Sequence, residues 1–456
     1  MASVTEQLAT WVVEVDQQTL PAIAQERVGN LVLDSIGNQF AGMAASTGRL
    51  LAEWVRGQGG AQVCTVTGRD FKTTPALATL VNGAASHALE NDDIATFSSH
   101  PNSPLTAASL ALGEKLGSSG RDVVVAWAIG WEVTAQTMKV CLGPRGNELI
   151  NRGWFNQGFQ ETLGVAALAS RLLGLGVDET RMAIGHAASA MGGMMKNRGT
   201  DTKGFTAGSA AMHGVMAAEL ASTGFTADLD ILDGDIGVAR LLGLDAGDPE
   251  KMLDGLGSWD LATRGATIRL HACCGASHWS MDALQQLLRR RPVAPDDIEA
   301  IDVEIPEFLT DMVPNHDPQT GLQAKYSLEH SLAAVALHGR AGIHQFADDA
   351  VRQPEAHELR KRVTIMPVPA QGPLQSRVIV TLRDGERLEE VATRSHGSPA
   401  DPLTDDERLA KFHECAGTLA PQEQRDRVIE LTTRLDSLAD VGELTAVLAV
   451  ASPQGT

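Results

Sequence analysis

Residues 21–43, PAIAQERVGNLVLDSIGNQFAGM, carry apolar side chains at the three- and four-residue spacing of a buried helix face. The side chains that form this face belong to Val28, Leu31, Val32, Ile36, Phe40 and Met43. Comparable patterns cover residues 104–116, 122–141, 162–175, 179–194 and 208–222. No repeat of fixed period accompanies them, which argues against a solenoid. The first part of the chain is therefore predicted to be all-helical.

The pattern changes near residue 268, beyond which strands are predicted. Residues 298–305, IEAIDVEI, alternate apolar and polar side chains, as a strand with one buried face does. Residues 363–365 predict a second strand. Residues 377–382 and 387–392 flank Asp384-Gly385, a strong cue for a hairpin turn.

Helical pattern also occurs at residues 327–337, between the first two strands, and again from Thr404 onward. We therefore predict a mainly α protein, in which a large all-helical domain carries an inserted smaller α+β lid domain. The helical domain is expected to comprise residues 1–267 and 394–456, and the lid domain residues 268–393.

The composition narrows the class of partner. The chain has 456 residues, with 57 Asp and Glu against 37 Lys and Arg, and a net charge of −20. Such a length exceeds the roughly 250–300 residues at which single cores stop growing, so two domains are expected. Nucleic acids and anionic membranes both require a basic face, so neither is expected as a partner. A small anionic substrate would need a local cluster of cations.

The sequence lacks the patterns of a membrane span, a signal peptide and a zinc site, and these absences set our expectations for location and metal binding. No stretch is long and apolar enough to span a membrane, and the first twenty residues hold no Lys or Arg of a signal peptide. The five cysteines show no zinc-type spacing, so we expect a cytoplasmic protein without a metal site. Sequence motifs for nucleotide-binding folds, zinc proteases and serine hydrolases are also absent.

The first candidate site is an acidic, histidine-containing segment at residues 86–104. Its titratable residues are His87, Glu90, Asp92, Asp93 and His100. A carboxylate beside an imidazole can act as a general acid–base pair or can orient the histidine. Capping and turn formation by Asp and Ser, or a divalent-metal site, are the alternatives.

A basic island at residues 195–204 forms the second candidate site. Lys196, Arg198 and Lys203 face a single acid there, Asp201, in an otherwise acidic protein. A lysine close to a helix N-terminus favours a bound carboxylate, because unpaired backbone N–H groups add to its charge. A solvated surface loop is the alternative.

The third site is the stretch HACCGASH at residues 271–278. Adjacent cysteines are poorly placed to share one metal ion, so Cys273 and Cys274 are interpreted as packing residues. His278 is the functional candidate, and a structural histidine is the alternative.

The stretch KYSLEH at residues 325–330 is the fourth site. An inward-facing His330 could enter a cleft, although a lone histidine on a helix is more often only hydrogen-bonded within the core. Its functional interpretation depends on the other three sites.

At these four places the sequence resembles the MmgE/PrpD family, which includes 2-methylcitrate dehydratase and cis-aconitate decarboxylase. The similar stretches are residues 87–101, 199–208, 273–278, 318–337 and 397–404. The resemblance implies a helical domain with an α+β lid and a cleft between them, a homodimer, and no required metal or organic cofactor. It also implies proton movement at the carbon next to a carboxylate of a small di- or tricarboxylate.

Individual residues carry over unevenly. His100, Lys203 and His278 match functional positions of the family, and Asp92-Asp93 match its acidic pair. Five positions depart from the family pattern: Glu90 replaces Asp, Ile94 replaces Thr or Ser, Asn156 and Thr206 replace His, and His330 replaces Tyr. These departures put the family's dehydratase and decarboxylase activities in doubt.

Epimerisation demands less of a site, because it only removes a proton and returns it to the other face. The pattern is similar to that of iminodisuccinate epimerase within the family. We therefore predict a cofactor-independent epimerase of a small polycarboxylate, iminodisuccinate. The predicted catalytic residues are His100, Lys203, His278 and His330, with substrate contacts from Asp93, Glu90, Arg198, Thr206 and Asn156. The alternatives are a 2-methylcitrate-like hydroxyacid dehydratase, which is a lyase, and a binding protein that has lost catalysis.

Overall fold

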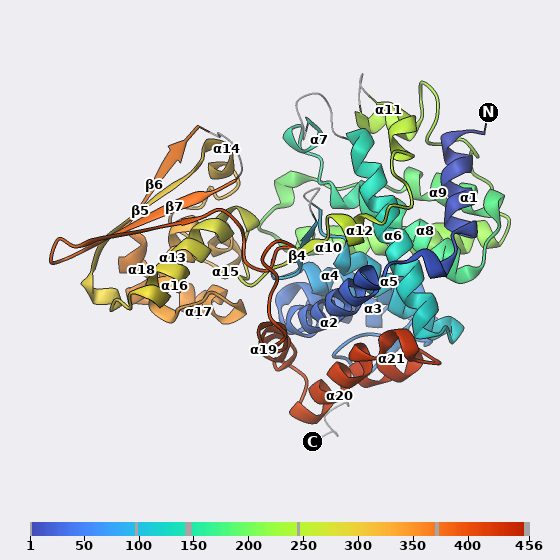
Figure 1. Ribbon diagram of the computed structural model, residues 1–456. Coiled ribbons are helices and arrows are strands. Elements are labelled where there is room, and N and C mark those ends of the chain that lie inside the picture. Colours follow the sequence, from blue (N-terminus) through green and yellow to red (C-terminus); the bar gives the residue numbers. More distant parts are fainter. Residues whose placement is uncertain (1, 96–98, 142–147, 244–246, 370–373, 451–456) are drawn as a thin grey trace. The chain divides into compact units, whose positions relative to one another are not determined.

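The computed structural model describes residues 2–95, 99–141, 148–243, 247–369 and 374–450 (Figure 1). The chain divides into two compact units. Unit 1 comprises Met1–Ala88, Ala95–Ala266 and Phe412–Thr456, and unit 2 comprises Leu89–Ile94 and Thr267–Lys411. The protein is mainly α-helical, as the sequence predicts.

The described residues of unit 1 form helices and one short antiparallel pair of strands. The helices are α1(Val4–Glu14), α2(Ala22–Ala44), α3(Ser46–Arg56), α4(Pro75–His87), α5(Asn102–Leu116), α6(Gly120–Cys141), α7(Glu148–Asn151), α8(Gln157–Leu173), α9(Val177–Ser189), α10(Asp201–Ser222), α11(Val238–Gly243), α12(Asp260–Thr263), α20(Gln422–Thr433) and α21(Gly442–Leu448). The two strands are β1(Cys64–Thr65) and β2(Lys72–Thr73). Helix α10 packs against α4, α8, α9 and α5, so it lies at the centre of this unit.

Glycines allow α10 to approach α4 closely. A Cβ atom on Gly208 would lie 2.1 Å from the Leu80 carbonyl oxygen, and one on Gly204 would lie 3.0 Å from that of Ala84. Both contacts involve backbone atoms of α4, which cannot move aside as a side chain can. The helix pair therefore depends on the absence of side chains at these two positions.

Unit 2 contains a four-stranded sheet of order β6-β5-β7-β8. Its strands are β5(Ile298–Pro306), β6(Val363–Val368), β7(Ser376–Leu382) and β8(Arg387–Ala392). Strand β5 runs parallel to β6 and antiparallel to β7, while β7 and β8 form the predicted hairpin. Its helices are α13(His278–Arg290), α14(Glu307–Thr310), α15(Gly321–Ala324), α16(Leu328–His338), α17(Asp348–Val351) and α18(Pro354–Arg360). Helices α13 and α16 contribute to the apolar core against the sheet.

The remaining elements are short or join the two units. Strands β3(Asp93–Ala95) and β4(Ala266–Ile268) pair where the chain passes between the units, and α19(Asp405–Ala416) carries it back. Short 3₁₀ helices are η1(Gln17–Thr19), η2(Met195–Asn197), η4(Pro249–Met252), η5(Gly275–Ser277), η6(Pro295–Asp297), η7(Ile343–Phe346) and η8(Leu435–Ser437).

Several boundaries differ from the predicted ones. Helix α8 begins at Gln157 and not at residue 162, and α9 ends at Ser189 and not at residue 194; the start of α10 and the extent of unit 2 also differ. Helix α10 begins at Asp201, seven residues before the predicted start. The sequence did not predict this first part of the helix because Gly204 and Gly208 weaken the helical pattern there. Unit 2 also takes residues 89–94, 267 and 394–411, which the sequence-based ranges assign to the helical domain. Segment 89–94 joins unit 2 through ion pairs that no local pattern predicts.

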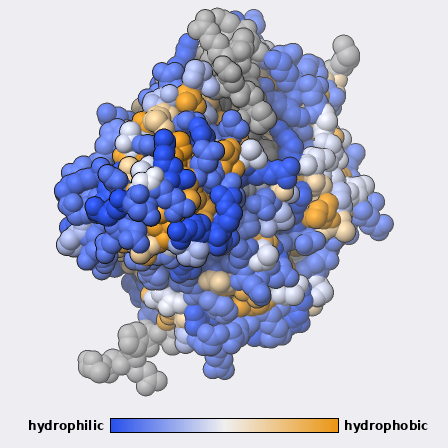
Figure 2. Space-filling model, turned by 60° about the vertical axis from the view of Figure 1, so that its left-hand side comes forward, coloured by the Kyte–Doolittle hydropathy of each residue, from blue (hydrophilic) through white to orange (hydrophobic). Residues whose placement is uncertain are grey.

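Among the described helices, none is both long enough and apolar enough to cross a membrane. The face shown in Figure 2 is largely hydrophilic, with hydrophobic residues in separate patches. This surface agrees with the net charge of −20.

Candidate functional site

In unit 1, Lys203 and His87 form a buried pair. Lys203 lies in the first turn of α10 and His87 is the last residue of α4, so the close packing of these helices brings them together. The Lys203 Nζ atom lies 2.8 Å from His87 Nε2. Lys203 is only 8% exposed and His87 only 1% exposed. A cation held in this way can receive a carboxylate.

His87 also contacts a histidine and an amide. Its ring centre lies 4.9 Å from that of His100, and its Nδ1 atom lies 3.4 Å from Gln157 Nε2. The ring of Phe155 lies 5.6 Å from Lys203 Nζ and provides a weak cation–π contact. His87 therefore connects Lys203 and His100, the two predicted catalytic residues of unit 1.

The backbone at His100 is held by a buried carboxylate. Glu161 of α8 accepts the backbone N–H of His100 at 3.0 Å and the Ser99 hydroxyl at 2.6 Å, both on Oε1. Pro101 follows and is the N-cap residue of α5. His100 itself is partly exposed, as a residue that meets a substrate must be.

Three predicted substrate contacts also belong to unit 1. Asn156 is buried directly before α8, and Thr206 is buried in α10, where its hydroxyl donates to the Thr202 carbonyl. Arg198 directly follows η2 and is partly exposed. Thr206 uses its only donor inside its own helix, which leaves its hydroxyl oxygen as an acceptor.

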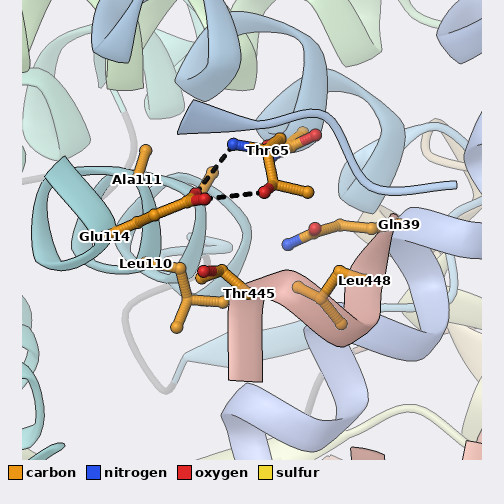
Figure 3. A pocket seen from close by; sticks show the side chains of 9 residues that line it. Gln39, Thr65, Leu110, Ala111, Glu114, Thr445 and Leu448 are labelled. Atoms are coloured by element: carbon orange, nitrogen blue, oxygen red, sulfur yellow. Dashed lines mark hydrogen bonds between the residues drawn. The ribbon is translucent and has the colours of Figure 1, made fainter. Parts of the chain in front are cut away.

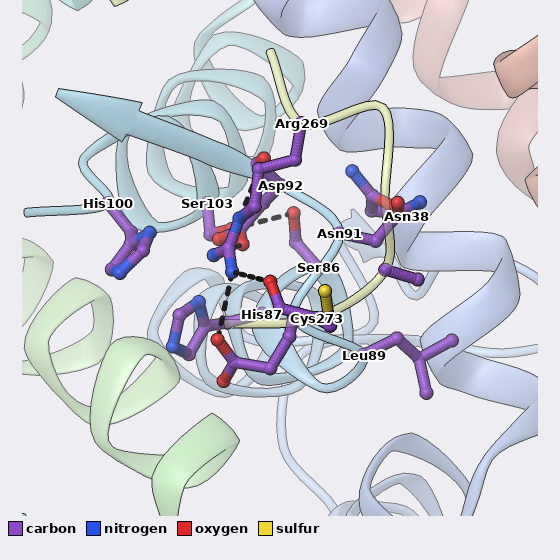
Figure 4. A network of polar contacts seen from close by, with 12 residues as sticks. Asn38, Ser86, His87, Leu89, Asn91, Asp92, His100, Ser103, Arg269 and Cys273 are labelled. Atoms are coloured by element: carbon purple, nitrogen blue, oxygen red, sulfur yellow. Dashed lines mark hydrogen bonds and ion pairs between the residues drawn. The ribbon is translucent and has the colours of Figure 1, made fainter. Parts of the chain in front are cut away.

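In unit 2, Arg269 binds two acidic residues of segment 89–94 (Figure 4). Its Nη1 atom lies 2.9 Å from Glu90 Oε2, and its Nη2 atom lies 2.5 Å from Asp92 Oδ1. The hydroxyl of Tyr326 donates to the other Glu90 oxygen at 2.9 Å. Glu90 has a positive φ of 53°, a strained backbone conformation that these bonds stabilise. Both oxygens of Glu90 are thus engaged within unit 2.

Two lysines hold the backbone of the same segment. Lys325 donates to the carbonyl oxygens of Leu89 at 2.6 Å and Ala272 at 2.8 Å, and Lys411 donates to that of Asn91 at 2.5 Å. Asp93 is fully buried at the start of β3. Cationic side chains thus satisfy backbone carbonyl groups as well as carboxylates around this segment.

His278 starts α13 and is buried. Its Nε2 atom lies 3.3 Å from the Cys273 carbonyl oxygen, and its ring meets that of His271 edge-on at 5.5 Å. Burial lowers the pKa of His278 well below its usual value, and the charges of His271 and Arg269 lower it further. His278 is therefore neutral at pH 7, the state that a general base requires.

Behind His278 lies a carboxylate–histidine pair. The His271 Nε2 atom is 3.3 Å from Asp282 Oδ1, and the other Asp282 oxygen accepts the backbone N–H of His396 at 2.9 Å. Burial raises the pKa of the Cys273 thiol to about 12, so this cysteine stays protonated and packs in the core.

His330 has hydrogen-bond partners at both ring nitrogens. Its Nε2 atom lies 2.9 Å from the Gln345 carbonyl oxygen, and Arg360 donates to its Nδ1 atom at 3.3 Å. Burial, together with the charge of Arg360, lowers the pKa of His330 to about 4. His330 is therefore a neutral histidine whose lone pair is directed at an arginine.

A small cavity of unit 1 lies apart from these residues (Figure 3). It is lined by Gln39, Thr65, Asn82, Ala107, Leu110, Ala111, Glu114, Thr445 and Leu448. Glu114 accepts the backbone N–H of Thr65 at 2.7 Å and its hydroxyl at 2.8 Å. None of the predicted site residues lines this cavity.

The structure thus distributes the predicted residues over the two units. His100, Lys203, Asn156, Arg198 and Thr206 belong to unit 1, and Glu90, Asp93, His278 and His330 belong to unit 2. Sequence reasoning assigned no individual role to His87, Gln157, Glu161, Arg269 or Tyr326. His87 lies in the same predicted cluster as His100, so their closeness in the sequence could have identified His87 as a candidate site residue. Arg269 and Glu161 lie in no pattern that could have identified them.

Known proteins resemble this chain over its whole length. The MmgE/PrpD N-terminal domain matches residues 6–248, and the MmgE/PrpD C-terminal domain matches residues 271–436. The cis-aconitate decarboxylase of Mus musculus is 28% identical over 470 residues, which cover 100% of this chain and 95% of the relative. That of Homo sapiens is 27% identical, with 99% and 96% covered. That of Aspergillus terreus is 25% identical, with 98% and 96% covered.

Proposed function

Since the chain belongs to the MmgE/PrpD family, we propose that it is a lyase that acts on a small polycarboxylate. The observation that carries this proposal is the end-to-end similarity to cis-aconitate decarboxylases, joined to the buried Lys203–His87 pair beside His100. Such relatives favour a lyase over the predicted epimerase. Cis-aconitate is accordingly the first substrate to test.

Decarboxylation of cis-aconitate needs a cation and a proton donor. When the bond to the departing carboxylate breaks, carbon dioxide leaves, and the electron pair of the broken bond shifts through the double bond. Negative charge then develops on the carbon next to a remaining carboxylate, and a proton must be added there. Lys203 supplies the cation that stabilises this enediolate-like charge, a contribution of about 3–4 kcal/mol for one well-placed donor. His100 delivers the proton.

Other reactions at the carbon next to a carboxylate pass through the same kind of enediolate-like anion. Dehydration of a hydroxyacid forms it by removing a proton, and then expels hydroxide. Epimerisation forms it and then returns the proton to the opposite face. Lys203 serves the same role in each case, and His100 exchanges the proton. A catalytic role for His278 of unit 2, which is buried and neutral, stays a prediction. His330 is left out of this proposed set because both of its ring nitrogens are occupied.

Iminodisuccinate epimerisation is the second candidate. Asn156 and Thr206, at positions where the family has histidines, favour it, because a site with fewer proton donors is less suited to expelling a hydroxyl group. A homodimeric state and a cytoplasmic location remain predictions.

Proton NMR in deuterium oxide separates these reactions. The protein is incubated with cis-aconitate, 2-methylcitrate and iminodisuccinate in turn. A lyase gives a decarboxylated or dehydrated alkene product from one of the first two. Deuterium exchange at iminodisuccinate without any alkene product would instead support the epimerase. If none of the three compounds changes, the proposed activity on them is wrong.

A further inference from the structure

We infer that His87 is a positioning residue that holds the Lys203 ammonium group in place through its Nε2 atom. The inference rests on the proposed function, because it assumes that Lys203 meets a substrate carboxylate. Its structural basis is the 2.8 Å contact between two buried side chains. A lysine has four rotatable side-chain bonds, so a fixed partner is needed to direct its charge.

The backbone is built to place the two side chains together. Lys203 precedes Gly204 and lies five residues before Gly208, two positions where the backbone of α10 comes close to α4. His87 ends α4, one turn beyond Ala84, whose carbonyl oxygen lies opposite Gly204. The helix crossing that requires glycine on α10 thus also sets the separation between Lys203 and His87.

Gln157 determines the tautomer of His87. If Lys203 donates to Nε2, the hydrogen of the neutral ring is on Nδ1, which lies 3.4 Å from Gln157 Nε2. The Gln157 Oε1 atom is buried and has no hydrogen-bond partner among the described residues. Exchanging the oxygen and the nitrogen of the Gln157 amide gives this oxygen the Nδ1–H of His87. Lys203 Nζ–H then donates to His87 Nε2, and His87 Nδ1–H donates to Gln157 Oε1.

A neutral imidazole suits this task better than a carboxylate would. An aspartate or glutamate in its place would bind the ammonium group but would neutralise its charge. An imidazole accepts one N–H and leaves the positive charge available to a substrate anion. His87 therefore orients Lys203 without competing with the substrate.

Two substitutions at His87 test the inference. His87→Gln can place an amide oxygen near the position of Nε2, whereas His87→Leu offers no acceptor. We expect His87→Leu to lower kcat/KM by about 10- to 100-fold, the range for a hydrogen bond to a charged group. His87→Gln should recover most of that loss. His213→Gln, on α10 but outside the pair, is the matched control and should leave kcat/KM unchanged.

A second measurement does not depend on turnover. In protein labelled with ¹⁵N-lysine, a buried hydrogen-bonded ammonium group exchanges slowly and gives its own NMR signal, which Lys203→Met would assign. We expect this signal to disappear in His87→Leu and to persist in His87→Gln. Its persistence in His87→Leu would overturn the inference, whatever the activity. Lack of turnover by the unmodified protein would instead contradict the proposed function, and the lysine signal would still decide the role of His87.

Discussion

Arg269 and Glu90 form a buried ion pair at 2.9 Å, although they are separated by 179 positions in the chain. The guanidinium group is completely buried, and it binds Asp92 as well. Segment 89–94 thereby becomes part of unit 2, while the residues on either side of it belong to unit 1. Glu90 and Asp92, which lie in the acidic motif of the family, are thus bound by Arg269, which lies outside the stretches that resemble the family.

Removing this arginine should destabilise the protein strongly. Arg269→Met leaves Glu90 and Asp92 buried without their cation, and we expect a loss of about 3–5 kcal/mol in the free energy of unfolding. Urea titration followed by circular dichroism measures it. Arg352→Met removes an exposed pair with Asp348 and should cost less than about 1 kcal/mol. Equal losses in the two variants would show that the buried pair stabilises the fold no more than the exposed pair does.

The glycine at the α4–α10 crossing should not tolerate a methyl group. In Gly208→Ala the new Cβ atom would lie 2.1 Å from the Leu80 carbonyl oxygen, so the helices must separate. We expect a loss of about 1–3 kcal/mol, the usual cost of overpacking a core. Gly29→Ala is the control, because its Cβ would meet nothing nearer than 4.0 Å. Alanine favours a helix there and should add about 0.5–1 kcal/mol. A stable, active Gly208→Ala protein would contradict the close approach.

Stability should fall in mild acid because of His330. Its pKa is about 4 in the folded protein, against 6.5 for an unperturbed histidine. His330 therefore binds a proton more readily in the unfolded chain than in the folded protein. The stability that depends on neutral His330 is fully present above about pH 6.5 and is lost as the pH falls toward 4. This histidine alone contributes a slope of up to about 1.4 kcal/mol per pH unit. Urea titrations at several pH values should show a shallower slope for His330→Gln, and an unchanged slope would refute the assignment.

Turnover should depend on Lys203 and His100. Lys203→Met removes the cation that stabilises the developing negative charge, and we expect kcat to fall by about 100- to 1,000-fold. His100→Ala should reduce kcat by a similar factor, since general acid–base catalysis contributes about 100- to 10,000-fold. Lys361→Met, at an exposed lysine outside all four candidate sites, is the control and should retain full activity. Intact turnover in both site variants would show that the candidate site is wrong.

Much of the fold was predictable because its signals are local. Residues 21–43 and 298–305 show the periods of a buried helix face and a strand, and the structure has α2 and β5 there. Asp384-Gly385 likewise marked the β7–β8 hairpin. The start of α10 was missed, since glycines that serve packing also erase the helical pattern.

The sequence by itself determined the mainly α class, the strands of the smaller unit and the residue types of the candidate site, because period, turn chemistry and charge are properties of neighbouring residues. Only the tertiary structure decided which side chains meet. Lys203 pairs with His87, and Arg269 buries Glu90, although the partners are more than 100 positions apart in the chain. The contact between His330 and the Gln345 carbonyl group spans a shorter stretch of 15 positions. Such contacts follow from helix packing and burial, which no local pattern encodes.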